Sequence, residues 1–300
     1  MIRKKYDILS SDYRVSVYFV IPAIISVLAF LLFPFVYTVV LSLSKFNLRD
    51  QSLSFIGLDN YISIFSSKAF IHSISITVVF ALYVLICSTA FGVLFALLLN
   101  QDFIGRGFAR AILIIPWAIP WVVIGIMWKW MLNAQFGLLN GLLYQLGLIK
   151  EYIPFLAKER WVLFISALPA VWRQASFSGI LLLASIQTIP DALYESAMID
   201  GAGTLRKFIS ITLPWMMPTL IVVLMFNTLY GFMQFDTVFM LTKGGPGDAT
   251  EVIAINMYRK AFESLKLGEG AAIGYVLSML CLTFGLVFIR ILRKVEDITK

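Results

Sequence analysis

The chain is short of charge. Asp, Glu, Lys and Arg together make up 14% of its 300 residues, whereas hydrophobic residues make up 60%. A soluble domain of ordinary composition carries about a quarter charged residues. The composition therefore predicts an integral membrane protein, an all-α helical bundle whose apolar surface faces lipid as well as its own interior.

Side chains that bind metals or form disulfides are also scarce. There is one histidine, His72, and the two cysteines, Cys87 and Cys281, both lie inside apolar runs. We therefore expect no histidine-based metal site, and we interpret the thiols as small buried hydrophobes. The net charge of +7 comes from basic residues that flank apolar segments. Anionic lipid headgroups are a better match for this pattern than nucleic acid.

A phosphate-binding loop of the form G-x-x-x-x-G-K-[ST] is missing as well. The stretch "GAGTLRK", Gly201 to Lys207, is rich in glycine, but it follows no predicted strand and lacks the final Gly-Lys-Ser/Thr. The chain is therefore not expected to be an enzyme that hydrolyses ATP, and no cofactor is expected in it.

What the chain has in abundance is long apolar runs. A membrane-spanning helix needs about 20 mainly apolar residues. Six segments qualify: Val17–Leu43, Ile71–Leu99, Ala111–Leu132, Trp161–Ile186, Trp215–Leu241 and Ala271–Leu292. We expect an N-terminal segment at 1–16, a six-helix transmembrane domain at 17–293 with a polar loop at about 187–214, and a tail at 294–300.

Basic residues near the ends of the spans predict the orientation. Six crossings place both termini on one side, and dense clusters lie at those termini: Arg3, Lys4, Lys5 and Arg14 at the first, and Arg290, Arg293, Lys294 and Lys300 at the second. Both termini are therefore expected in the cytoplasm of a multi-pass protein of the cytoplasmic membrane. The polar loop between spans four and five then faces the cytoplasm too.

This polar loop reads as two short helices joined by a tight turn. Pro190 suits the start of the first helix, and Gly201 and Gly203 permit the turn because glycine adopts positive φ without strain. Thr204 is expected to cap the second helix, and Pro214 to start the next span.

Two motifs carry a resemblance to a known family. Glu195-Ser196-Ala197, three residues, Gly201, nine residues and Ile211-x-Leu213-Pro214 resemble the cytoplasmic signature of permease subunits of binding-protein-dependent ABC importers, which usually have alanine at position 196. The fuller "ESAMIDGAGTLRKFISITLP", together with "LTKGGPGDAT" and the "YRKAF" that follows it, resembles the carbohydrate branch and its first, maltose-type permease. The resemblance runs from Val17 to the C-terminus.

The resemblance implies partners. The cytoplasmic helix would dock into a cleft of a separate ATPase subunit through Tyr194, Glu195, Ser196, Ala197, Met198, Asp200 and Gly201. A dimer of that subunit would bind ATP and Mg, a second homologous permease would complete the path, and an extracytoplasmic sugar-binding protein would contact the loop Leu241–Thr250. The alternative for the cytoplasmic segment is an ordinary interfacial loop whose charges are solvated. The alternative for the loop Leu241–Thr250 is a plain connector between spans five and six.

Polar side chains inside the spans are candidates for a substrate pathway, since they are expensive in lipid. Span five carries Asn227, Tyr230, Gly231 and Gln234 at i, i+3, i+4 and i+7, and span four carries Arg173, Gln174 and Phe177. Their amide and guanidinium donors beside aromatic rings suit a hydroxyl-rich ligand, and in the maltose-type family the same two spans hold the sugar. Phe226 and Thr228 are expected to point away from this stripe.

The alternative for these polar groups is that they hydrogen-bond neighbouring helices and hold the bundle together. Arg173 could instead pair with Asp236, the one acid inside a predicted span. An ion-coupled secondary sugar carrier is the main rival function, but such carriers tend to have more spans, repeats and buried acids.

Overall fold

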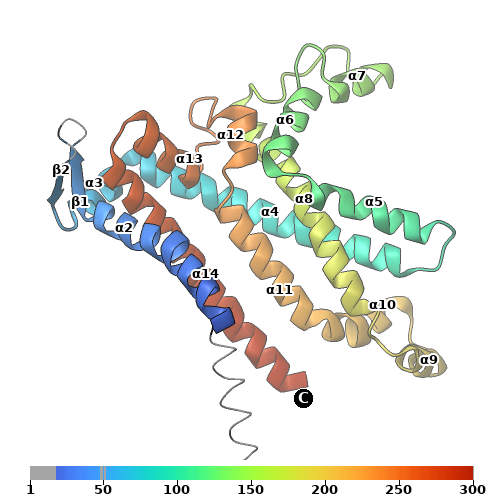
Figure 1. Cartoon of the computed structure of the whole chain (residues 1–300). Coiled ribbons are helices and arrows are strands. Elements are labelled where there is room, and N and C mark those ends of the chain that lie inside the picture. Colours follow the sequence, from blue (N-terminus) through green and yellow to red (C-terminus); the bar gives the residue numbers. More distant parts are fainter. Residues whose placement is uncertain (1–17, 48–49, 51, 300) are drawn as a thin grey trace, which may run out of the picture. The chain divides into compact units, whose positions relative to one another are not determined.

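A computed structural model describes residues 18–47, 50 and 52–299, with side chains described as far as residue 295. Figure 1 labels its helices and strands. The segment expected at 1–16, its basic cluster and Lys300 lie outside the described residues. The chain divides into two compact units, Met1–Ser66 with Arg259–Tyr275 (unit 1) and Ser67–Tyr258 with Val276–Lys300 (unit 2).

Unit 1 contains the first predicted span and several short elements. The span Tyr18–Ser42 passes through a stretch of wider π turns and ends in a regular helix. Its labelled elements are η1 (Leu28–Leu32), α2 (Phe33–Ser42), β1 (Ser44–Asn47), β2 (Ser52–Phe55), α3 (Asp59–Ser66), η3 (Arg259–Glu263) and the first turns of α14 (Leu267–Thr299). The antiparallel hairpin β1–β2 is the only β-sheet among the described residues.

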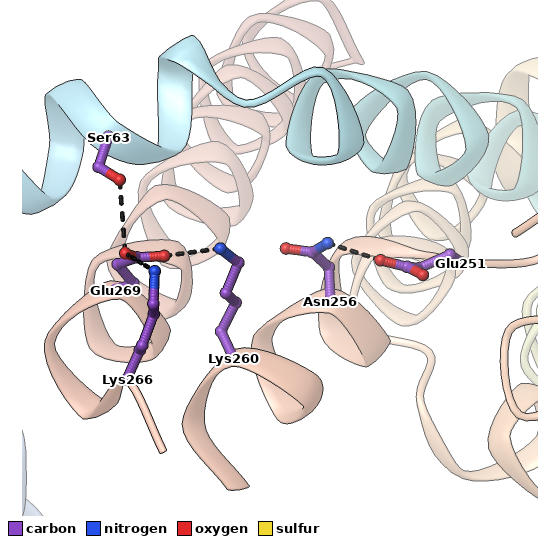
Figure 2. A network of polar contacts seen from close by, with 6 residues as sticks. All are labelled: Ser63, Glu251, Asn256, Lys260, Lys266 and Glu269. Atoms are coloured by element: carbon purple, nitrogen blue, oxygen red, sulfur yellow. Dashed lines mark hydrogen bonds and ion pairs between the residues drawn. The ribbon is translucent and has the colours of Figure 1, made fainter. Parts of the chain in front are cut away.

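A buried ion network joins the parts of unit 1 that follow its span. The Glu269 carboxylate accepts from Lys260 Nζ at 2.7 Å and from Lys266 Nζ at 3.0 Å, and Ser63 Oγ lies 3.4 Å away (Figure 2). The carboxylate is buried, and a buried charge needs such partners to offset its desolvation. The network therefore fixes the start of α14 against η3 and α3.

Unit 2 contains most of the membrane-spanning bundle. Its elements are α4 (Lys68–Asn100), α5 (Arg106–Ala118), α6 (Trp121–Met131), α7 (Leu138–Gln145), α8 (Glu159–Ile186), α9 (Asp191–Ile199), α10 (Thr204–Lys207), η2 (Phe208–Thr212), α11 (Leu213–Phe232), α12 (Asp236–Thr242), α13 (Ile253–Tyr258) and the remainder of α14. Figure 1 shows α9 and α10 at one end of α8, and α6 and α7 at the other end.

Helices α4, α8 and α11 pack side by side at the centre of unit 2 (Figure 1). Small residues allow the close approach: a Cβ on Gly92 of α4 would collide with Ser178 of α8. Lipid tails are as apolar as the helices, so the hydrophobic effect does not drive membrane helices together. Their association depends on close packing, which small residues allow. Two apolar clusters lie in the described part of unit 2; one contains Phe80 and Val84, and the other contains Leu182 and Met216.

Among the described residues, four helices are long and apolar enough to cross a membrane, and up to six spans result if each of two bent helix pairs counts as one. The upper count equals the six predicted spans, but the third predicted span is not one helix. Helices α5 and α6 diverge by 101°. Ile119 between them has an extended backbone, as expected before a proline. Pro120 has no N–H with which to continue the hydrogen bonds of the helix.

The fifth span also differs from its prediction. It begins at Thr204, runs through the π turns of η2 and ends at Phe232, so the predicted end at Leu241 is wrong. Pro214 lies within the continuing helix and does not start it. The N-cap of α10 is Gly203, and Thr204, which we expected to be the cap, is the first helical residue.

Candidate coupling segment and substrate pathway

The turn after α9 is built by Gly201. This glycine has a φ of +74°, where a side chain would be strained. Its N–H donates to the Met198 carbonyl at 3.0 Å, and the Ala202 N–H donates to the Ala197 carbonyl at 2.9 Å. This pair of bonds is the Schellman motif, which satisfies the last carbonyls of a helix. The turn therefore sets the angle between α9 and α10.

The predicted coupling residues differ in exposure. Glu195, Ser196, Met198, Asp200 and Gly201 are exposed, and Ala197 and Tyr194 are half-buried. The Tyr194 hydroxyl lies 2.8 Å from Thr212 Oγ1, so this residue anchors α9 to the base of the fifth span.

Two apolar side chains that sequence reasoning missed stand beside these residues. Ile199 is 87% exposed and Leu205 is 72% exposed. With Met198, which is also exposed, they form a group of exposed apolar side chains of the kind that marks a surface for a partner. In the sequence, both are large apolar residues within a few positions of the charged residues Asp200, Arg206 and Lys207.

One face of α11 contacts its neighbouring helices. Asn227 is fully buried, and its Nδ2 donates to Thr89 Oγ1 at 3.0 Å and to Ser178 Oγ at 3.1 Å. A Cβ on Gly231 would lie 2.8 Å from the Cα of Ala81. Asn227 thus joins α4, α8 and α11, and Gly231 permits a close approach of α11 to α4.

The other face of α11 carries aromatic rings. Phe226 stacks on Tyr230 with ring centroids 6.3 Å apart, and it meets Phe177 of α8 edge to face at 5.6 Å. Phe177 stacks on Trp117 at 5.8 Å, and Tyr230 lies 6.1 Å from Trp121. We call these five rings the aromatic face. Tyr230 is 37% exposed.

The aromatic face corrects one expectation and adds three residues. Phe226, expected to point away from the pathway stripe, is part of the aromatic face, whereas Thr228 is buried and bonds the Leu224 carbonyl of its own helix. Trp117 and Trp121 were missed because they lie beside the unpredicted break in span three.

Arg173 lies beside this face. Its Nη2 donates to the Trp117 carbonyl at 3.0 Å, and its Cζ lies 4.1 Å from the centre of the Trp121 ring. Within the described part of the chain it makes no ion pair with Asp236, which stands in the first turn of α12. The alternative prediction, that Arg173 pairs with Asp236, is therefore wrong for this structure.

The two glutamines lie apart. Gln174 is fully buried in α8, and neither amide atom has a hydrogen-bond partner among the described residues. Gln234 is buried beyond the end of α11 and donates to Thr237 Oγ1 at 2.7 Å. The expectation that Gln234 continues the helical stripe of Asn227 is wrong, because the helix ends at Phe232.

The loop after α12 is tightly folded on itself. Thr250 Oγ1 lies 2.7 Å from Thr242 Oγ1 and donates to the Gly245 carbonyl at 2.8 Å. Gly247 and Asp248 at its tip are exposed and have positive φ. Figure 1 shows the adjoining α12 at the α6 end of unit 2, away from α9.

The fold and these sites define a class of protein. Residues 88–296 match the family of inner-membrane components of binding-protein-dependent transport systems, and the chain belongs to this family. It is therefore a multi-pass membrane permease, and the class predicted from the cytoplasmic signature is confirmed.

Its relatives make the assignment more specific. The trehalose/maltose transport system permease protein MalF of Thermococcus litoralis is 36% identical over 93% of each chain. The sulfoquinovosyl glycerol transport system permease protein SmoG of Agrobacterium fabrum is 33% identical over 94% of this chain and 91% of its own. A chain of a bacterial ABC transporter for the acidic polysaccharide alginate matches with a TM-score of 0.81 at 25% identity, covering 97% of this chain and 99% of its own. The protein is a permease subunit of a binding-protein-dependent ABC importer.

Proposed function

We propose that the chain moves a carbohydrate, such as a sugar, an oligosaccharide or a polyol, across the cytoplasmic membrane by alternating access. The observation that carries the substrate class is the aromatic face, with Arg173 beside it. Sugar rings have apolar faces that stack on aromatic rings and hydroxyl edges that need hydrogen-bond donors. The names of the relatives, which concern trehalose and maltose, a sulfosugar glycerol and alginate, support the same class.

Within this proposal the pathway residues have different roles. Tyr230 and Phe177 would contact the sugar directly, and Gln174 offers an amide without a partner in the described structure. Arg173 lies beside the rings, and Gln234 stands at the end of α11. Asn227 and Gly231 would contribute through the packing of α11.

The energy for transport would come from a separate ATPase. We propose that α9, with Glu195, Met198 and the exposed Ile199, docks on one subunit of an ATPase dimer that binds ATP and Mg. No ATP hydrolysis is assigned to this chain. A second homologous permease would complete the path, because one such chain supplies half of it.

The remaining partners and the orientation follow from the same proposal. The extracytoplasmic sugar-binding protein would contact the loop Leu241–Thr250, and an alginate transporter has been solved with a ligand-bound periplasmic protein. The loop adjoins the end of unit 2 opposite to α9 (Figure 1), as contacts on the two sides of a membrane require. Both termini would then lie in the cytoplasm, with the permease domain at 17–293 and the coupling loop at about 187–214.

Reconstitution in liposomes tests the proposal. The chain would be purified with the subunits that accompany it, and uptake of labelled maltose, trehalose and a panel of further sugars and polyols would be measured. We expect uptake that needs ATP, the second permease, the ATPase and the binding protein. Uptake of sugar by this chain alone, or driven by an ion gradient without ATP, would contradict the proposal.

Two substitutions test the coupling segment in that system. Glu195→Lys reverses the charge on the exposed face of α9, and Gly201→Val places a β-branched residue at positive φ. Both should lower sugar-stimulated ATP hydrolysis while the protein still inserts in the membrane. Lys150→Glu in an exposed segment is a charge-reversal control. Unchanged stimulation in both coupling variants would rule out α9 as the docking helix.

A further inference from the structure

The break in span three leaves backbone groups that need partners. Helix α5 ends at Ala118, so the carbonyl of Trp117 is among the last four of the helix and has no partner within it. Because α6 departs at 101° after Pro120, the next turn cannot supply the missing N–H groups. A broken span inside a membrane needs side chains from neighbouring helices to satisfy these groups.

Arg173 supplies such a donor and bridges both sides of the break. Its Nη2 bonds the Trp117 carbonyl before the break, and its guanidinium covers the Trp121 ring after the break. A cation near the C-terminus of a helix is also favoured by the helix dipole. Three residues further along α8, the Ser176 hydroxyl donates to the carbonyl of Leu113, one turn before Trp117 in α5.

We propose that Arg173 is a positioning residue that tethers the break between α5 and α6 to α8, and so fixes Trp117 and Trp121 in the aromatic face. The role does not require contact between the guanidinium and the transported molecule. It therefore goes beyond the proposed function and does not depend on the identity of the sugar.

The chemistry of the tether is specific to arginine. The planar guanidinium stacks on the indole while one of its N–H groups reaches the carbonyl, and a lysine ammonium cannot do both. Arg173 Nε and Nη1 are buried without a partner among the described residues, so the side chain costs desolvation that an apolar residue would avoid. An apolar residue could fill the same space without this desolvation cost, so the guanidinium has a role other than packing.

The test measures the distance between α5 and α6 across the break. Cys87 and Cys281 are replaced by Ala, and spin labels are attached to Ile112→Cys on α5 and Ile126→Cys on α6, both exposed positions. Pulsed electron paramagnetic resonance then gives the distance distribution between the labels in the full chain, reconstituted with the subunits that co-purify. The measurement needs no sugar, so its failure is distinguishable from failure of the transport assignment.

Arg173→Lys should broaden the distribution and lower the ratio of parental to altered distances by about tenfold, the value of one hydrogen bond from a charged donor. The matched control is Arg160→Lys, because Arg160 lies 5.3 Å over the Trp161 ring at the exposed start of α8. The control should leave the distribution unchanged. A parental distribution in Arg173→Lys, or equal broadening in both variants, overturns the proposal.

A second variant covers the case in which Arg173→Lys does not assemble. Trp121→Leu removes the stacking partner beyond the break and leaves the bond from Arg173 to the Trp117 carbonyl in place. It should broaden the same distribution by a smaller amount. An unchanged distribution in an assembled Trp121→Leu protein would show that the guanidinium does not hold α6, and the tether would be rejected.

Discussion

The two faces of α11 differ in what they contact. The face with Asn227 and Gly231 is buried against α4 and α8, and its polar group has both of its hydrogen-bond partners inside the protein. The face with Phe226 and Tyr230 belongs to a ring cluster in which Tyr230 and Trp117 are partly exposed. One face of α11 therefore contributes to helix packing, and the other face is the candidate for contact with a ligand.

This difference changes how polar residues in a span are interpreted. A buried amide that is satisfied by neighbouring helices stabilises the bundle, and its polarity alone does not identify a pathway. An exposed aromatic ring beside hydrogen-bond donors is the better candidate for contact with sugar. The two assignments predict opposite results when each face is changed, because one should alter stability and the other should alter substrate choice.

The largest effect is expected from Gly231→Val. Its Cβ would lie 2.8 Å from the Ala81 backbone, which cannot move aside like a flexible side chain. Overpacking of this kind costs about 1–3 kcal/mol and sometimes more, so the assembled complex should be largely lost. Gly285→Val in α14 is the control, since a Cβ there meets nothing within 4 Å. Size-exclusion profiles in detergent measure the outcome, and equal recovery of the two variants would contradict the close approach.

A smaller loss of stability is expected from Asn227→Leu, which removes the bonds to Thr89 and Ser178. Interhelical hydrogen bonds in membranes are worth about 0.6 kcal/mol on average and up to about 1.7. The melting temperature should fall while the ranking of transported sugars stays parental. Thr228→Val is the control, because that hydroxyl bonds its own helix. A changed sugar ranking in a stable Asn227→Leu complex would place Asn227 in the pathway after all.

Tyr230→Ala should produce the reverse pattern. An aromatic contact is worth about 0.5–1.5 kcal/mol beyond its buried area, which corresponds to roughly a tenfold loss in apparent sugar affinity at most. The melting temperature should change little because the ring is partly exposed. Uptake assays with several sugars measure this, and Tyr230→Phe should retain most of the parental behaviour. If Tyr230→Ala lost stability and kept its sugar preference, the division between the two faces would fail.

The smallest effect is expected from Gln234→Leu. The side chain bonds Thr237 three residues away, outside α11, so its loss affects a local turn and neither face of the helix. Both melting temperature and sugar ranking should stay near parental values. A marked shift in sugar preference would show that the end of α11 takes part in recognition, as the unbroken stripe predicted from sequence implied.

The features that the sequence predicted well are local ones. The turn at Gly201 follows from the preference of glycine for positive φ, and the helix before it follows from residues within a few positions. The number of spans follows from length and hydropathy. Such properties depend on neighbouring residues, so a single sequence contains the information that they require.

The features it did not predict depend on distant contacts or on small shifts of helical phase. The break at Pro120 turns α6 away, and it brings Trp117 and Trp121 to Phe177 and Tyr230 from other helices. The end of α11 at Phe232 removed Gln234 from a stripe that assumed a regular helix. The helical spacing of polar residues assumes an unbroken helix, so it cannot locate a ligand-binding surface where a span is broken.

Photochemical capture of the transported sugar tests the central claim most directly. A photoreactive phenylalanine analogue replaces Tyr230 on the aromatic face, and in a separate protein it replaces Trp215, which is exposed at the start of the same helix. The reconstituted complexes are illuminated during ATP-driven uptake of a labelled sugar. The account predicts label on this chain from position 230 and little from position 215. Equal label at the two positions, or none at position 230 in a complex that still transports, would contradict it.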